Sequence, residues 1–111
     1  GGMTDNPRYA LYESKYTVYL ANRMEEEKNF TCDVVGRCCE SGDIIQPKVM
    51  LPESIKRGDL VAVLTTGAYN YSMASNYNRV PRPPVVIIKD GADRLAVRRE
   101  TFENLCALDV D

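Results

Sequence analysis

Turn-forming residues interrupt this chain roughly every 8 to 15 residues, so only short elements of regular structure fit between them. Single glycines at Gly36, Gly58 and Gly91 provide some of these breaks, and a proline-rich stretch at residues 81–84 provides another. Proline lacks the amide proton that helices and inner strands need, so residues 81–84 should form an irregular connector. Short runs between frequent turns are typical of all-β proteins.

The runs between the turns have the alternating or β-branched pattern of strands. Residues 16–21 alternate between two faces, and the Asp90-Gly91 pair lies between two apolar runs, which is a hairpin signal. The expected strands are residues 16–21, 30–35, 44–45, 60–65, 85–89 and 94–98. Residues 1–7 should be loop, residues 71–77 one or two helical turns, and residues 100–108 a short helix capped by Thr101.

These elements predict one domain over residues 1–111 with a mainly β fold, an antiparallel β-barrel or sandwich with one or two short helices. The chain carries a net charge of −2 and has a pI of about 5.2. Its basic residues are scattered, which argues against binding to nucleic acid. No apolar run approaches the roughly 18 residues of a membrane span, so no membrane partner is expected.

The cysteines argue against a metal site. The chain has four cysteines and no histidine, and none of the cysteines forms a Cys-x-x-Cys pair, so a structural zinc site is not expected. No signal peptide is recognisable, and a reducing cytoplasmic location fits this cysteine usage best. Without histidine, any proton chemistry must come from cysteine, tyrosine, lysine or a carboxylate.

The stretch Cys38-Cys39-Glu40-Ser41-Gly42-Asp43 is the most informative for chemistry. A thiol and a carboxylate stand side by side, and turn-forming residues follow that can project the pair into a cleft. A cysteine thiol can transfer a proton near neutral pH, and Glu40 can hold a cationic group. The alternative is that Cys39 is simply a small buried hydrophobic residue.

Three further residues suit the binding of a small ligand. Arg8 and Tyr12 stand four apart in a segment expected to be extended or loop, where a guanidinium and a phenol could grip one carboxylate. Tyr69 follows two small residues at the end of an apolar run, where the backbone can approach a ligand closely. The competing interpretation is a surface arginine over packed tyrosines.

Several motifs, in their order and approximate spacing, resemble the C-terminal domain of diaminopimelate decarboxylases, which belong to the fold-type III pyridoxal-phosphate decarboxylases. The resemblance covers nearly the whole chain. The matching stretches are Gly2–Arg8, Leu11-Tyr12, Val35-Gly36, Cys39–Asp43, Gly58–Leu60, Gly67–Tyr69, Ser75–Asn78, Arg82-Pro83 and Arg98–Thr101.

The resemblance implies a domain like the C-terminal domain of alanine racemase, joined to an N-terminal (β/α)8 barrel that is absent here and carries the lysine for pyridoxal phosphate. It implies a homodimer whose active sites lie between domains and subunits, and conversion of meso-diaminopimelate to L-lysine. Cys39 matches the proton donor, which reaches into the site of the neighbouring subunit, and Glu40 matches the residue that holds the distal amine. Arg8 and Tyr12 match groups that bind the substrate, and Tyr69 matches a residue that touches cofactor and substrate.

Two other functions stay open at the level of sequence. One is a related pyridoxal-phosphate decarboxylase that acts on ornithine or carboxynorspermidine. Glu40 together with Arg8 and Tyr12 favours diaminopimelate, because that substrate carries both an amine and a carboxylate at its distal end. The other is a non-catalytic β-barrel module for interaction or dimerisation.

Overall fold

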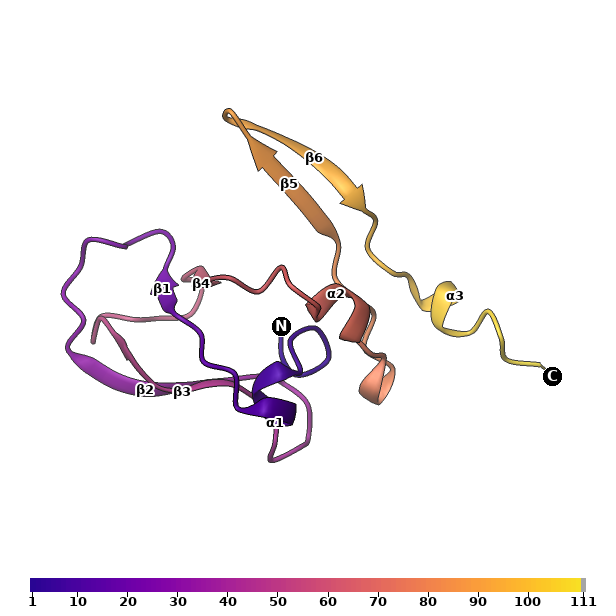
Figure 1. Ribbon diagram of the computed structural model, residues 1–111, viewed down its shortest axis with the longest axis horizontal. Helices are drawn as coiled ribbons and strands as arrows, with labels where there is room; N and C mark the ends of the chain where they lie inside the picture. The colour runs from indigo at the N-terminus through magenta and orange to yellow at the C-terminus, as the bar shows by residue number, and fades with distance from the viewer. Residues whose placement is uncertain (111) are drawn as a thin grey trace.

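The computed structural model describes residues 1–110 as six strands with short helical segments before, between and after them (Figure 1). The elements are α1 (Arg8–Tyr12), β1 (Val18–Leu20), β2 (Phe30–Val35), β3 (Ile44–Leu51), β4 (Val61–Val63), α2 (Asn70–Met73), the 3₁₀ turn η1 (Tyr77–Arg79), β5 (Val85–Lys89), β6 (Ala92–Val97) and α3 (Phe102–Leu105).

All strand pairs are antiparallel. In the described part of the chain, β1 pairs with β4, β2 with β3, and β5 with β6, which gives three two-stranded sheets. The first two sheets pack together over a small core built from β1 and β3. The buried residues of this core are Val18, Leu20, Val49 and Leu51. The predicted mainly β, antiparallel class with short helices is therefore confirmed.

Most of the expected strands form close to their predicted limits. The β5–β6 hairpin turns at Asp90 and Gly91, whose φ angles of 52° and 75° are those that a tight hairpin turn requires. β3 is longer than predicted, because a bulge opposite Asp33 accommodates Pro47 and Lys48. Lys48 has a φ of 53°, and its amide donates to Asp33 Oδ1 at 2.8 Å, so the strand continues past the proline.

The prediction of an extended or loop segment around Arg8 and Tyr12 was wrong, because these residues form the single-turn helix α1. Pro7 precedes the helix, and its carbonyl accepts from the amide of Leu11 at 3.0 Å. Proline fits the start of a helix, because the amides there have no hydrogen-bond acceptor within the helix and proline loses no bond by lacking one. Over residues 1–110, none of the helices is long and apolar enough to cross a membrane.

The chain is more open than a compact domain of its size. It exposes 8216 Å², whereas a monomeric protein of this mass exposes about 6,200 Å². Its radius of gyration is 15.6 Å, against about 13 Å for a compact chain of this length. The β5–β6 hairpin projects away from the two packed sheets (Figure 1), and Ile88 and Leu95 on it are exposed. Surfaces of this kind are typical of chains that pack against further polypeptide.

Arg23 joins the loop after β1 to the turn before β4. Its guanidinium forms an ion pair with Asp59 and donates to Glu26 at 3.1 Å and to the Ser54 hydroxyl at 2.7 Å. The amide of Lys56, followed by the neighbouring Asn22 and Arg23 side chains, lowers the pKa of Asp59 below its ordinary value. The network ties together two loops that contribute little to the apolar core.

Asp59→Asn should destabilise the protein at pH 7, and the difference from wild type should shrink as the pH falls below about 4. Folding lowers the pKa of Asp59, so its stabilisation is present above the unfolded pKa and is lost as the pH falls through the folded pKa. Urea unfolding at pH 7 and at about pH 3 measures this difference. Glu25→Gln, an exposed change in the same loop, should have no such effect. An equal destabilisation by Asp59→Asn at both pH values would contradict the electrostatic origin.

Candidate functional site

Cys39 lies at the apex of the turn that connects β2 to β3. The amide of Glu40 donates to the carbonyl of Cys38 at 2.8 Å, which closes a three-residue turn around Cys39. The carboxylate of Glu40 accepts from the Ser41 hydroxyl at 3.3 Å and from the Gly42 amide at 3.1 Å. The side chains of Cys39 and Glu40 are both exposed, so the thiol is not a packed core residue and a ligand can reach both groups.

The carboxylate of Asp43 holds this turn in place from beneath. Asp43 is only 3% exposed, and it accepts from the Met3 amide at 2.6 Å and the Cys38 amide at 2.8 Å. A methyl group added at Gly36 would overlap both of its carboxylate oxygens, and one added at Gly2 would lie 2.8 Å from the nearer oxygen. Glycine at these two positions therefore makes room for a buried carboxylate between the N-terminal loop and the Cys39 turn.

The two thiols of the pair Cys38-Cys39 have different surroundings. Burial, reinforced by the nearby Asp43 carboxylate, raises the pKa of Cys38. Cys32 packs against the core, and burial raises the pKa of its thiol as well. Cys39 is the exposed member of the pair, and the matching stretch Cys39–Asp43 begins at this residue and leaves out Cys38.

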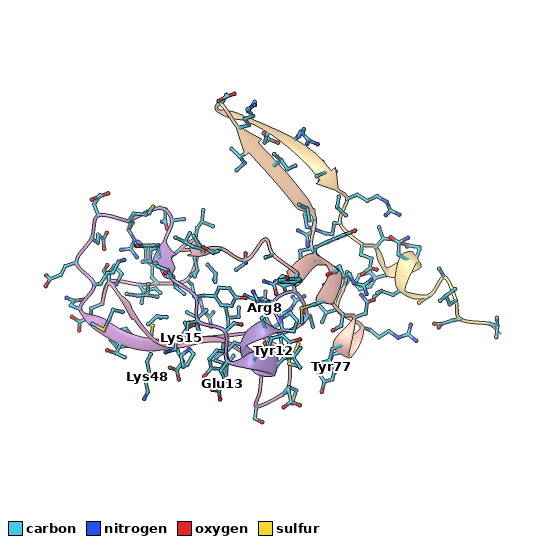
Figure 2. All side chains as sticks on the ribbon, viewed as in Figure 1. Arg8, Tyr12, Glu13, Lys15, Lys48 and Tyr77 are labelled. Atoms are coloured by element: carbon cyan, nitrogen blue, oxygen red, sulfur yellow. The ribbon has the colours of Figure 1, made fainter. Side chains whose placement is uncertain are left out.

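The second group of predicted site residues gathers around α1. The guanidinium carbon of Arg8 lies 5.4 Å from the centre of the Tyr69 ring, in the geometry of a cation–π contact. Tyr12 stands one helical turn after Arg8 on α1, and its ring is 63% exposed. Figure 2 shows Arg8 and Tyr12 together on this helix. The structure therefore brings Arg8 and Tyr69 together across 61 positions of sequence, with Tyr12 beside them.

Tyr69 occupies an unusual backbone conformation. Its φ and ψ are 70° and −34°, and the amide of Asn70 donates to the carbonyl of Ala68 at 2.9 Å, which closes a γ-turn with positive φ. This turn is rare and strained for a bulky residue, at a cost of roughly 1–3 kcal/mol. Tyr69 is 68% exposed, so the strained turn presents its aromatic ring to solvent.

Asn70 helps to hold the strained turn. Its side chain is 5% exposed, and its amide nitrogen donates to the carbonyl of Thr66 at 2.9 Å. Sequence reasoning missed both Asn70 and Asp43, because both are polar residues in segments rich in turn formers, where a solvated side chain is the usual expectation. Their only sequence signal was position, because Asn70 follows Tyr69 and Asp43 is the last residue of the matching stretch Cys39–Asp43.

The site residues thus form two groups, exposed except for the half-buried Arg8, and the N-terminal loop connects them. Met3 bonds to Asp43 beneath the Cys39 turn, and the chain runs on through Pro7 into α1. The carbonyl of Thr4 accepts from the amide of Ser75, shortly after Tyr69 and α2. One group offers a thiol and a carboxylate, and the other offers a guanidinium and two phenols. The first group can bind an amine and supply a proton, and the second can bind an acid.

The chain matches the family model described as pyridoxal-dependent decarboxylase, C-terminal sheet domain, over residues 1–67. It is 53% identical to the diaminopimelate decarboxylase of Bacillus subtilis over 110 residues, which cover 99% of this chain and 25% of that protein. It is 50% identical to the diaminopimelate decarboxylase of Staphylococcus aureus, over 95% of this chain and 25% of that protein. The chain therefore spans about a quarter of the length of these curated relatives.

Solved structures show the same similarity. A diaminopimelate decarboxylase from M. jannaschii superposes with a TM-score of 0.90 at 32% identity, covering 100% of this chain and 25% of that one. A diaminopimelate decarboxylase from Helicobacter pylori, crystallised in complex with L-lysine, superposes with a TM-score of 0.87 at 36% identity. This match covers 98% of this chain and 26% of that chain.

Iodoacetamide should alkylate Cys39 before Cys38 and Cys32 at pH 7.5. Cys39 is exposed at the turn apex, whereas the other two thiols are partly buried and have raised pKa values. Time-resolved labelling followed by tandem mass spectrometry separates the adjacent positions. Cys106, which is exposed on the C-terminal segment, serves as the reference for an accessible thiol. Labelling of Cys38 as fast as Cys39 would contradict this assignment of the exposed thiol.

Proposed function

The chain belongs to the C-terminal sheet domains of pyridoxal-dependent decarboxylases, and from this premise we propose that it forms part of the active site of a diaminopimelate decarboxylase. The complete enzyme would remove one carboxylate from meso-diaminopimelate and release L-lysine. Relatives named for this activity, and relatives from Helicobacter pylori and M. jannaschii crystallised with L-lysine, support the choice of substrate and product. The observation that carries the proposal is the exposed Cys39–Glu40 turn, joined through Asp43 to the loop that leads into α1.

The distal end of diaminopimelate carries an amine and a carboxylate, and the two groups of site residues have the complementary charges. In this proposal Glu40 holds the amine, while Arg8 and Tyr12 on α1 hold the carboxylate. A substrate that lacks the distal carboxylate, such as ornithine, would leave the guanidinium of Arg8 without its anionic partner. Sites built from paired polar groups discriminate strongly against analogues that lack one partner.

Cys39 is the proton donor in this proposal. Loss of carbon dioxide leaves a carbanion at the alpha carbon, and one proton must reach that carbon before lysine can leave. The chain contains no histidine, and the Cys39 thiol is exposed at a turn apex, where it can approach a bound substrate. Its position on a short turn, with backbone bonds on both sides, favours a defined direction for the transfer.

The residues around α1 suit contact with pyridoxal phosphate. Tyr69, which lies beside Arg8 of α1, presents an exposed aromatic face and a hydroxyl, and these fit a planar aromatic ring with polar substituents. When bound, the cofactor supplies the electron sink that makes decarboxylation possible. This chain would contribute the contact through Tyr69, while the lysine that binds the cofactor would belong to the N-terminal barrel.

The partners follow from the same proposal. The openness of the chain and its exposed apolar residues on β5 and β6 support packing against an N-terminal barrel domain and a second subunit of a homodimer. Four free thiols support a cytoplasmic location.

In the full-length enzyme, Cys39→Ala should lower kcat for diaminopimelate by about 10²-fold or more and change KM little. A proton donor acts in the transition state and contributes little to binding of the ground state. Steady-state measurement of lysine release gives both parameters. Cys106→Ala removes an exposed thiol distant in sequence from the site and should leave both unchanged. A rise in KM as large as the fall in kcat would show that Cys39 binds substrate instead.

The 111-residue chain alone should not release lysine from diaminopimelate. Mixed with pyridoxal phosphate, it should give no stronger visible absorption band than free lysine mixed with pyridoxal phosphate gives. Apart from the half-buried Arg8, its site residues are exposed, so the remainder of the pocket must come from other polypeptide. Absorption spectra with an equal concentration of free lysine as control, together with a lysine assay, measure this. Turnover by the isolated chain would contradict the proposal that the site is shared.

A further inference from the structure

The loop between β4 and α2 has a strained backbone at two positions. Thr65 and Tyr69 have φ angles of 60° and 70°, in the left-handed region that β-branched and bulky residues rarely adopt. Gly67 lies between them, so the glycine of this loop is at neither of the positions that would favour it. Strained backbone persists only where the surrounding structure holds it, and it clusters at sites that bind ligands.

The side chain of Asn70 braces this loop. Its amide nitrogen donates to the carbonyl of Thr66 at 2.9 Å and to the hydroxyl of Tyr16, which leads into β1, at 3.5 Å. Asn70 is 5% exposed, although it directly follows the exposed Tyr69. At two adjacent positions the chain therefore directs an amide to the interior and an aromatic ring to solvent.

The second polar atom of the Asn70 side chain makes asparagine a costly choice at this position. Its Oδ1 is buried and has no hydrogen-bond partner among residues 1–110. A buried acceptor without a donor destabilises a fold, and an apolar side chain would avoid that penalty. The benefit of asparagine therefore lies in the bond from its nitrogen to Thr66, and that bond acts on the turn at Tyr69.

Other contacts hold Tyr69 from the side of the helices. Its carbonyl accepts from the amide of Met73 at 3.0 Å and from the hydroxyl of Ser72 at 2.8 Å, both on α2. The guanidinium carbon of Arg8 on α1 lies 5.4 Å from the centre of its ring. Without the bond that Asn70 makes on the β4 side, these contacts would leave the strained turn free to relax.

We propose that Asn70 is a positioning residue that fixes the ring of Tyr69 beside Arg8 for contact with pyridoxal phosphate. The inference rests on the proposed function, because that function gives Tyr69 its contact with the cofactor. Asn70 is buried and acts only through the turn that it braces. A group that is held in its binding orientation beforehand loses less entropy when the ligand binds, so loss of the brace weakens binding.

Titration of the full-length apoenzyme with pyridoxal phosphate tests this proposal. Asn70→Ala removes the bond to Thr66, and we expect the dissociation constant of the cofactor to rise about 5- to 20-fold. In a Tyr69→Ala background, Asn70→Ala should change that constant less than about twofold, because the ring that Asn70 positions is gone. Equal effects of Asn70→Ala in both backgrounds would overturn the proposal, and so would an unchanged constant in folded Asn70→Ala enzyme.

Asn76→Ala is the matched control. The partly buried Asn76 follows α2, and its amide also donates to a backbone carbonyl four positions away, that of Val80 at 3.1 Å, as well as to the Glu100 carboxylate. Asn76→Ala should lower the thermal unfolding temperature but leave the dissociation constant of the cofactor within about twofold of wild type. An equal loss of affinity in Asn76→Ala would show that any loosening near α2 has this effect, which overturns the assignment to Asn70.

Asn70→Ser removes the same bond by a smaller change, and it serves if Asn70→Ala fails to fold. The serine hydroxyl stops one covalent bond short of the position of Nδ2, so it does not reach the carbonyl of Thr66. We expect the same loss of cofactor affinity, which should again disappear in the Tyr69→Ala background. A folded Asn70→Ser enzyme with the affinity of wild type would overturn the proposal.

Hydrogen exchange of the full-length apoenzyme separates this inference from the proposed function, because it requires neither cofactor nor turnover. The amides of Asn70 and Met73 donate to the carbonyls of Ala68 and Tyr69. Asn70→Ala should speed exchange of both amides, whereas Asn76→Ala should not. If wild type neither binds pyridoxal phosphate nor decarboxylates diaminopimelate, the proposed function fails, and faster exchange in Asn70→Ala still supports the brace. Unchanged exchange in Asn70→Ala overturns the positioning role alone.

Discussion

The hydrogen bonds that the Asp43 carboxylate accepts from Met3 and Cys38 are the constraint that fixes the Cys39 turn to the N-terminal loop. A carboxylate buried at this depth is stabilised only when donors satisfy it, and here two backbone amides do so. The bonds join a loop at the start of the chain to a turn between two strands. Because the same loop continues into α1 and bonds to Ser75, one buried carboxylate organises three separate segments.

Cys39 and Tyr69 are the two residues proposed to contact the reacting centre. Each lies at the apex of a three-residue turn. The turn at Cys39 is a low-cost conformation, whereas the turn at Tyr69 requires a positive φ for a bulky side chain. A buried Asn70 bonded to Thr66 holds the second turn against its strain. Tight turns project side chains from a fixed backbone, which suits a site that must meet groups from another domain.

The small apolar core explains how an open chain can still position these groups. Four buried aliphatic residues on β1 and β3 hold the two sheets together, while polar networks around Asp43 and Arg23 fix the loops. The β5–β6 hairpin lies outside this core and exposes apolar side chains such as Ile88. The surface of the chain is thus divided between a site made of polar turns and an apolar hairpin suited to packing.

The sequence by itself determined the features that arise from neighbours along the chain. Strand alternation, the Asp90-Gly91 hairpin and the Thr101 cap of α3 were predicted because their causes lie within a few residues. The thiol beside a carboxylate was likewise visible as a motif. Only the tertiary structure decided that Arg8 stacks on Tyr69, that Asp43 is buried beneath the Cys39 turn, and that residues 8–12 are helical. These features depend on contacts between segments distant in sequence, and local residue preferences carry no information about such contacts.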